Sequence, residues 1–290
     1  MNNKPKIILR GLAFPESHRW HSGKLWFSDM HAHKVMTVDL KGKTETICEV
    51  PLCPSGLGWT ADGRLLIVSM KDKKLMRLDA SGLTCLADLN GLASGQCNDM
   101  VTDALGRAYI GNFGKDTSLG KEFRVGPAEI VMVTPDGKAC VAAGDLNFPN
   151  GMVITPDGHT LIAAESFAPR LTSFKIDSKG GLSGREVWAE LDKDFTSGKG
   201  IMPDGICLDA EGAVWVANAG GPAVYRVKKG GEITQKIETS ANAVACTLGG
   251  TDRRTLFIMA AVSTDDRVCR EKMAGRIEII EVEVPGAGLP

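Results

Sequence analysis

Four oxygen-bearing side chains stand at matching distances before turns in this chain of 290 residues. Asn98, Asn150 and Asp204 each lie eight residues before a glycine, and Glu16 lies seven before one, in a segment with a shorter turn. Two carboxylates and two amides, with no His or Cys at the matching positions, suit a hard divalent cation. Because Asn or Asp before glycine is alone more often a turn former than a ligand, a metal site requires a fold that brings these residues together.

The turns belong to a sequence repeat. Five glycines and one arginine mark it at intervals of 40, 43, 52, 54 and 41 residues, at positions Gly23, Gly63, Gly106, Gly158, Gly212 and Arg253. Such intervals are typical of propeller blades. A β-prone run follows each turn, a second alternating run follows that, and five units add a weaker further run. The turn residues between runs favour antiparallel hairpins, and no segment shows a competing helical period.

The two ends of the chain complement each other. The sixth unit ends near Pro285 without a fourth strand, while Lys6–Arg10 precedes the first unit and has no sheet of its own. Pairing the amino-terminal strand as the outer strand of the last blade would close the ring and leave no unpaired blade sheet between the termini. We therefore predict an all-β, six-bladed β-propeller closed by the amino-terminal strand, with residues 1–290 as a single domain. Two stacked three-unit domains would need a linker near the middle, where the repeat continues instead.

This fold would bring the oxygen-bearing residues together. The inner strands of a propeller surround the channel with the same polarity, so their first residues converge at one end. We expect one divalent metal ion there, with Ca²⁺ as the first choice and Mg²⁺, Mn²⁺ or Zn²⁺ as alternatives. Asn98 precedes Asp99 rather than glycine, and it could bind substrate instead of the metal.

Composition narrows the class of partner. A formal net charge of -1 with 43% hydrophobic residues gives no charge excess for nucleic acid or an anionic membrane. The first apolar run, residues 7–9, is too short for the core of a signal peptide. We expect a cytoplasmic monomer or homo-oligomer that binds a small-molecule substrate. The eight cysteines form no C-x-x-C pair, which argues against a thiolate zinc site.

The residues resemble the senescence marker protein / gluconolactonase / luciferin-regenerating enzyme family of six-bladed, calcium-dependent propellers, over nearly the whole chain. The resemblance is carried by Phe14-Pro15-Glu16-Ser17 through Trp20, Asn98-Asp99 with Asp103 and Gly106-Arg107, Pro149-Asn150-Gly151, Pro203-Asp204-Gly205 with Asp209, and Gly249-Gly250 with Asp252.

The resemblance implies roles for individual residues. Glu16, Asn150 and Asp204 would bind the metal, Asn98 would lie at the metal or the substrate, and Asp204 would be a candidate general base. Characterised relatives are mostly lactonases, and some hydrolyse organophosphates. Sugar-lactone members have an arginine where this chain has Gln96, so we expect a substrate with fewer hydroxyl groups than a sugar lactone.

The loops that follow each second strand should surround the metal end and set specificity. They supply Met30, Asn112 and Phe167 as candidate substrate contacts, beside Asn98 and Gln96. Their apolar residues and few cations predict a partly apolar pocket. The alternative is that each is a surface residue that packs only locally.

A metal with open positions can polarise an ester carbonyl while a carboxylate accepts a proton from the attacking water. Asp204 and Asp99 are the candidate bases. We therefore predict a metal-dependent hydrolase that opens a lactone. A non-catalytic propeller stapled by its metal is one alternative. The same metal site used for phosphoester hydrolysis, dehydration or isomerisation is another.

Overall fold

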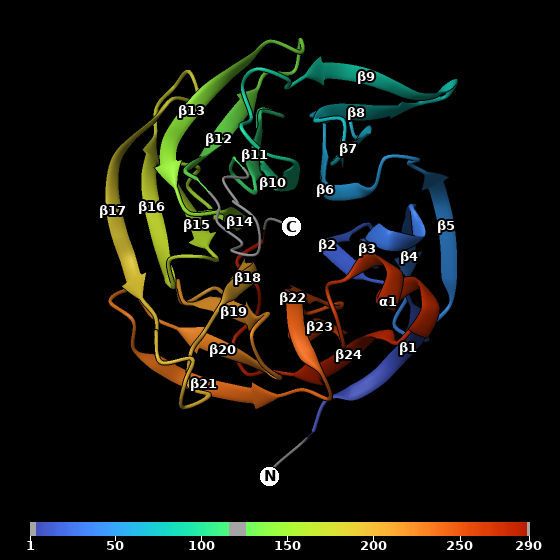
Figure 1. The fold of residues 1–290 in the computed structure, drawn as a ribbon, viewed down its shortest axis with the longest axis vertical. Coiled ribbons are helices and arrows are strands. Elements are labelled where there is room, and N and C mark those ends of the chain that lie inside the picture. The colour runs from blue at the N-terminus through green and yellow to red at the C-terminus, as the bar shows by residue number, and fades with distance from the viewer. Residues whose placement is uncertain (1–3, 116–125, 289–290) are drawn as a thin grey trace, which may run out of the picture.

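Six four-stranded antiparallel sheets surround a central channel in the computed structural model, which describes residues 4–115 and 126–288 (Figure 1). The prediction of a six-bladed all-β propeller is confirmed. Part of the segment between Asn112 and Ala128 lies outside the described residues.

Each blade runs from an innermost to an outermost strand. Blade 1 comprises β2 (Pro15–His21), β3 (Lys24–Asp29), β4 (Lys34–Val38) and β5 (Thr44–Glu49). Blade 2 comprises β6 (Pro54–Trp59), β7 (Leu65–Ser69), β8 (Lys74–Asp79) and β9 (Gly82–Asp88). Blade 3 comprises β10 (Cys97–Thr102), β11 (Ala108–Asn112), β12 (Ala128–Val133) and β13 (Ala139–Leu146). Blade 4 comprises β14 (Pro149–Ile154), β15 (Thr160–Glu165), β16 (Arg170–Ile176) and β17 (Leu182–Glu190). Blade 5 comprises β18 (Pro203–Leu208), β19 (Val214–Asn218), β20 (Ala223–Val227) and β21 (Ile233–Glu238). Blade 6 comprises β22 (Asn242–Gly249), β23 (Thr255–Ala261), β24 (Gly275–Glu281) and β1 (Lys6–Leu12).

The ring closes as predicted. β1 pairs antiparallel with β24 as the outermost strand of blade 6, with Lys6 opposite Ile279 and Leu12 opposite Gly275. The first strand of the chain therefore completes the last sheet and protects its edge.

The hydrophobic core lies between neighbouring blades. Strands β7 and β19 are buried along their whole length, whereas the outermost strand β5 is mostly exposed. One cluster fills the seam between blades 6 and 1 with Leu25, Phe27, Phe257 and Met259. Second strands packed on both faces explain the continuous apolar runs seen in the sequence.

Two short helices differ from the sequence prediction. They are η1 (Met30–Ala32) and α1 (Asp266–Lys272), both in loops that follow second strands. Asp265 caps α1 by accepting a hydrogen bond from the Val268 backbone N–H at 2.9 Å. A helix this short has too few turns to show a periodic pattern, so local capping determines it.

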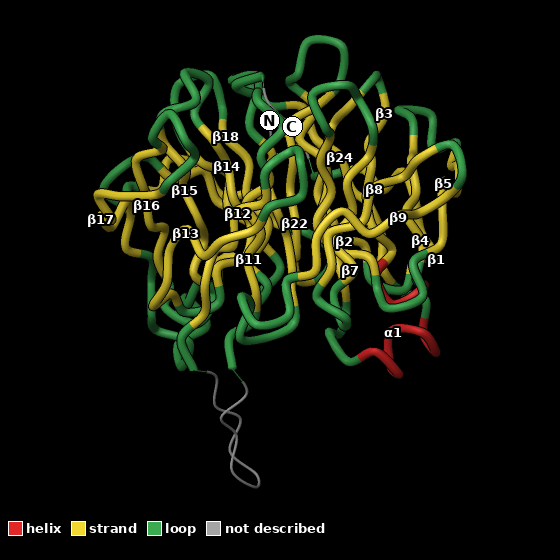
Figure 2. The backbone as a smooth tube through the Cα atoms, turned by 90° about the horizontal axis from the view of Figure 1, so that it is seen from above, coloured by secondary structure: helices red, strands yellow, loops and turns green. Residues whose placement is uncertain are grey.

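The turns between the first and second strands of each blade and the carboxyl-terminal segment lie at the end of the ring opposite α1. Figure 2 shows α1 at one end of the ring and the carboxyl terminus at the other. Backbone hydrogen bonds from Ala210 N–H to the Pro285 carbonyl and from Ala287 N–H to the Leu208 carbonyl attach that segment to blade 5. None of the helices in the described ranges is long and apolar enough to cross a membrane.

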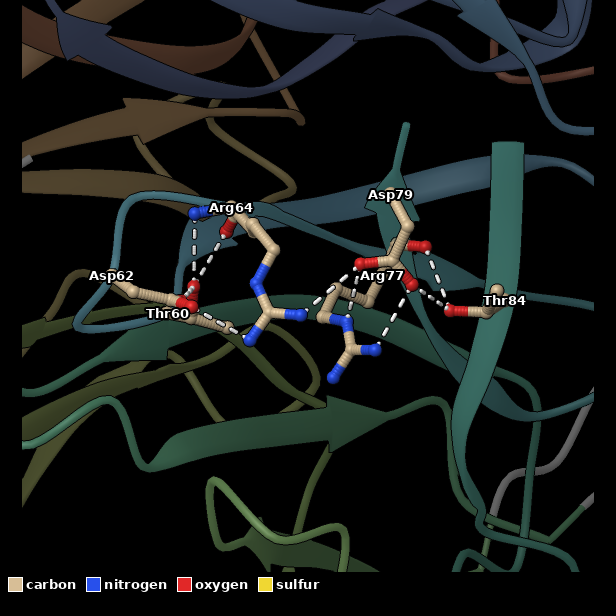
Figure 3. A network of polar contacts seen from close by, with 6 residues as sticks. All are labelled: Thr60, Asp62, Arg64, Arg77, Asp79 and Thr84. Carbon is tan, nitrogen blue, oxygen red and sulfur yellow. Dashed lines mark hydrogen bonds and ion pairs between the residues drawn. The ribbon is translucent and has the colours of Figure 1, made fainter. Parts of the chain in front are cut away.

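Side chains fix the turns at this end. In blade 2, Thr60 donates to Asp62, and the Thr60 hydroxyl accepts the Arg64 backbone N–H at 2.9 Å (Figure 3). Arg64 reaches Asp79 at 3.2 Å, and Asp79 also binds Arg77 at 2.8 Å, which lowers the Asp79 pKa. Thr60 and Asp62 therefore stabilise the turn.

Deleting residues 1–12 should destabilise the whole ring, because β24 would lose its partner and expose an edge. We expect the melting temperature to fall by about 10 °C or more, with self-association through β24. Thermal unfolding and size-exclusion chromatography measure both effects. Deletion of residues 1–4 alone, which leaves β1 intact, is the control, and an equal loss there would contradict this account of closure.

Candidate functional site

The candidate site residues occupy one structural position in successive blades. Each inner strand has a register shift against the second strand, between Glu16 and Arg19, Pro54 and Leu57, Cys97 and Met100, Pro149 and Met152, Pro203 and Ile206, and Ala243 and Ala245. Glu16, Asn98, Asn150 and Asp204 all stand at these shifts. A bulge changes the direction of a side chain and is frequent beside functional sites.

Hydrogen bonds join these positions around the channel mouth. The Asn98 amide donates to Asn150 Oδ1 at 2.9 Å, and the Asn150 amide donates to Ser166 Oγ at 3.1 Å. Asn150 also hydrogen-bonds the Asp204 side chain. The inner strands of blades 3, 4 and 5 are thus connected through their site residues.

Ser55 occupies the same position in blade 2, and the sequence analysis missed it. It lies eight residues before Gly63, so the repeat contained the signal, but a serine hydroxyl is not among the usual protein ligands of Ca²⁺. Its hydroxyl donates to Asn98 Oδ1 at 3.1 Å and lies 3.4 Å from the Ser17 hydroxyl. In blade 6 the position is Val244, which is apolar and buried. Five blades therefore present oxygen-bearing side chains at this level.

Glu16 and Asp204 are buried carboxylates without a basic partner. Each is less than 9% exposed, and none of the ion pairs among the described residues involves either. Burial raises the pKa of both carboxyls; the charge of Asp204 raises that of Glu16 further, and Asp99 adds to the effect on Asp204, whose pKa rises to about 8. Buried carboxylates of this kind require a proton or a cation.

The donor set fits a hard divalent cation. No three His, Cys, Asp or Glu side chains cluster as a metal site within the described ranges. The candidate set has two carboxylates, Glu16 and Asp204, and would be completed by amide oxygens from Asn150 or Asn98. Mixed carboxylate and amide oxygens are typical of calcium ligands.

Asp99 has a different environment from Asp204. Its Oδ1 accepts hydrogen bonds from Arg19 Nη2 and from the Met100 backbone N–H, both at 2.9 Å. Burial raises the pKa of Asp99, and Arg19 opposes this effect. One carboxylate oxygen of this candidate base is therefore held by an ion pair.

Two of the predicted substrate contacts, Met30 and Asn112, are held by the surrounding structure. Met30 is buried in the core between blades 6 and 1. The Asn112 side chain accepts from the Gly114 backbone N–H at 2.8 Å and donates to the Glu129 carbonyl at 2.9 Å, which fixes its own loop. Gln96 accepts the Phe113 backbone N–H on its carbonyl at 3.0 Å. Met30 and Asn112 thus have structural contacts of their own.

An aromatic cluster adjoins Gln96. Phe113 stacks on Phe148 with ring centroids 4.2 Å apart, and Phe148 contacts Phe167 at 5.1 Å. Phe167 remains 40% exposed. Phe148 was not among the predicted contacts; it is placed by its left-handed backbone conformation, which the sequence did not indicate. We name Phe113, Phe148 and Phe167 the aromatic cluster.

The fold and the site place this protein among six-bladed β-propellers with oxygen-bearing side chains at one end of the ring. The chain belongs to the family described as the SMP-30/Gluconolactonase/LRE-like region, whose profile matches residues 14–262. The predicted family is confirmed.

Individual relatives are distant. Regucalcin from Danio rerio is 29% identical over 182 residues, which cover 62% of this chain and 59% of that protein. The 6-deoxy-6-sulfogluconolactonase of Pseudomonas putida is 24% identical over 276 residues, 92% of this chain and 89% of that protein. A luciferin-regenerating enzyme structure superposes with a TM-score of 0.81 at 16% identity, covering 97% of both chains. A calcium-binding regucalcin from Agrobacterium tumefaciens gives 0.78 at 24% identity, covering 99% of this chain and 96% of that one.

Gly151, which follows Asn150, is required by the close approach of the inner strands. A Cβ at this position would lie 2.6 Å from both the Asp204 carbonyl oxygen and the Ile206 nitrogen. We expect Gly151→Ala to lower the free energy of unfolding by about 2 kcal/mol or more, measured by urea denaturation. In Gly144→Ala the new Cβ meets nothing within 4 Å, so this control should stay within about 0.5 kcal/mol. Equal stability of the two variants would contradict the close packing.

Proposed function

We propose that this protein is a divalent-metal-dependent lactonase whose active site is the channel mouth formed by blades 1 to 5. The supporting observation is the pair of buried carboxylates, Glu16 and Asp204, which lie at the bulges of β2 and β18 and form no ion pair among the described residues. Amide and hydroxyl groups stand at the same position in blades 2 to 4. We choose lactones as the substrate class because the relatives in this family include a pentonolactonase from Haloferax volcanii and the sulfogluconolactonase.

Glu16, Asn150 and Asp204 would hold the metal, with Ca²⁺ as the first choice. A divalent cation bound there would supply a Lewis acid for the ester carbonyl. Asn98 and Ser55 already hydrogen-bond each other at the same level, at 3.1 Å. Both can exchange this bond for one to a substrate oxygen, so we assign them to substrate binding.

Asp204 is the candidate general base. A carboxylate oxygen of Asp204 would accept a proton from water as the water oxygen attacks the carbonyl carbon. The carbon–oxygen bond of the ring would then break, and the leaving alkoxide would take the proton from Asp204, which gives the hydroxy acid and restores the carboxylate. Asp99 is the weaker candidate because Arg19 and the Met100 N–H occupy one of its oxygens.

The aromatic cluster and Gln96 favour a lactone with few hydroxyl groups. Neutral Gln96 offers no guanidinium for several hydroxyls, and the nearby rings offer apolar surface. Phe167 is the most exposed of them and the best placed to contact an alkyl chain. Apolar contact of this kind discriminates between substrates by about 1–3 kcal/mol for each small group.

The protein should open at least one lactone in a metal-dependent manner. We would assay δ-gluconolactone, γ-butyrolactone and γ-lactones with longer alkyl chains, with added Ca²⁺ and with EDTA. Turnover should disappear with the chelator, because the site residues cannot replace the Lewis acid, and return with Ca²⁺. Asp204→Asn should lower kcat at least about a hundredfold if it removes the base.

The other outcomes are equally informative. Metal binding without opening of any lactone would favour the non-catalytic, metal-stapled propeller. Hydrolysis of a phosphotriester in the absence of lactonase activity would assign the same site to another reaction. Near-normal turnover by Asp204→Asn with bound metal would refute its role as the base.

Phe167→Ala should reduce kcat/KM for an alkyl γ-lactone roughly tenfold and change that for δ-gluconolactone much less, because the ring supplies apolar contact only. Steady-state kinetics on both substrates measure the ratio. Leu105→Ala is the control, since Leu105 is also exposed but lies in the turn before β11, at the opposite end of the ring. An equal loss on both lactones would argue against a role in specificity.

A further inference from the structure

Arg19 is a buried cation just below the candidate site. It lies in β2, three residues after Glu16, and its side chain is 5% exposed. Its Nη2 pairs with Asp99 Oδ1 at 2.9 Å, and the guanidinium also donates to the Met100 and His18 carbonyl oxygens. The Asp99 side chain is 4% exposed, so both charges are removed from water.

This ion pair joins two blades that are not neighbours. Arg19 belongs to blade 1 and Asp99 to blade 3, whereas β6 of blade 2 carries glycine at positions 56 and 58. A Cβ on Gly56 would lie 2.5 Å from the Met100 nitrogen, and one on Gly58 would lie 2.6 Å from Thr102 Cγ2. Blade 2 therefore packs tightly on blade 3 and lets a side chain of blade 1 reach Asp99.

The pair acts electrostatically on the candidate metal ligands. Asp99 opposes the charged forms of both Glu16 and Asp204, while Arg19 favours the charged form of Glu16. The formal charges of Arg19 and Asp99 sum to zero, so Glu16 and Asp204, when ionised, leave a net formal charge that matches a divalent cation. Without Arg19, three carboxylates would surround the same mouth.

We propose that Arg19 is a positioning residue that neutralises the charge of Asp99 beside the metal site. The net charge of the site then comes from Glu16 and Asp204 alone, and it matches that of a divalent cation. This inference rests on the proposed metal site. Removing one partner leaves a buried charge of known sign, so the two single substitutions must act on cation affinity in opposite directions.

The test is a double-mutant cycle read by calorimetric titration of the chelator-treated protein with Ca²⁺ and, separately, with Tb³⁺. Asp99→Asn should weaken Ca²⁺ binding about tenfold, and Arg19→Met should tighten it and raise the preference for Tb³⁺ about tenfold. The double variant should return to within about threefold of the wild type, because both charges are then absent. Arg19→Lys keeps the charge and should also stay within about threefold.

A matched control comes from another buried pair. Arg226 binds Asp209 at 2.7 Å, with side chains 9% and 0% exposed, beside the turn at the opposite end of blade 5. Arg226→Met should leave Ca²⁺ affinity unchanged. Thermal unfolding of every metal-free variant separates loss of fold from loss of binding.

The outcomes distinguish the two proposals. Wild-type protein that binds neither cation would overturn the metal site and this inference together. Wild-type binding with equal weakening by Asp99→Asn, Arg19→Met and Arg19→Lys would overturn the inference and leave the metal site standing. Opposite shifts in the single variants, with recovery in the double variant, would establish it.

Discussion

The structure depends on how two like charges are buried together. Glu16 and Asp204 lie at the channel mouth on blades 1 and 5, and burial disfavours the ionised form of each. Desolvating two carboxylates costs free energy that the propeller must offset by packing elsewhere or by binding a counter-charge. The apolar seams between blades bury side chains of the inner and second strands and so supply this packing.

The inner strands lie very close together. Gly56, Gly151 and Gly205 follow site residues, and a Cβ at each would come within 3 Å of the next inner strand. The position is Ser17 in blade 1, Ala245 in blade 6 and Asp99 in blade 3. Of these three residues Asp99 alone is ionisable, so blade 3 adds a third buried carboxylate, which pairs with Arg19 of blade 1.

The sequence predicted those features that repeat. The interval between turns predicted the blades, the unpaired first strand predicted the closure, and the common spacing identified equivalent positions, which the register shifts confirm. It did not predict the contacts that occur only once. Arg19 reaches Asp99 from a different level of its strand, so no spacing relates them. Phe148 joins the aromatic cluster through a backbone conformation, and Asn112 fixes a loop, although its type and position suited substrate binding equally well.

The two ends of the ring differ in how their polar side chains are hydrogen-bonded. At the turn end, threonine and aspartate side chains satisfy the backbone locally, and residues 285–287 hydrogen-bond to the turns of blades 5 and 6. The polar groups of the Thr60 and Thr155 turns are thus paired within each turn. At the other end, the bulges turn carboxylate, amide and hydroxyl groups towards one another, where they hydrogen-bond mainly among themselves. Hydrogen bonds between such groups can be exchanged for bonds to a cation or a substrate oxygen without exposing backbone groups.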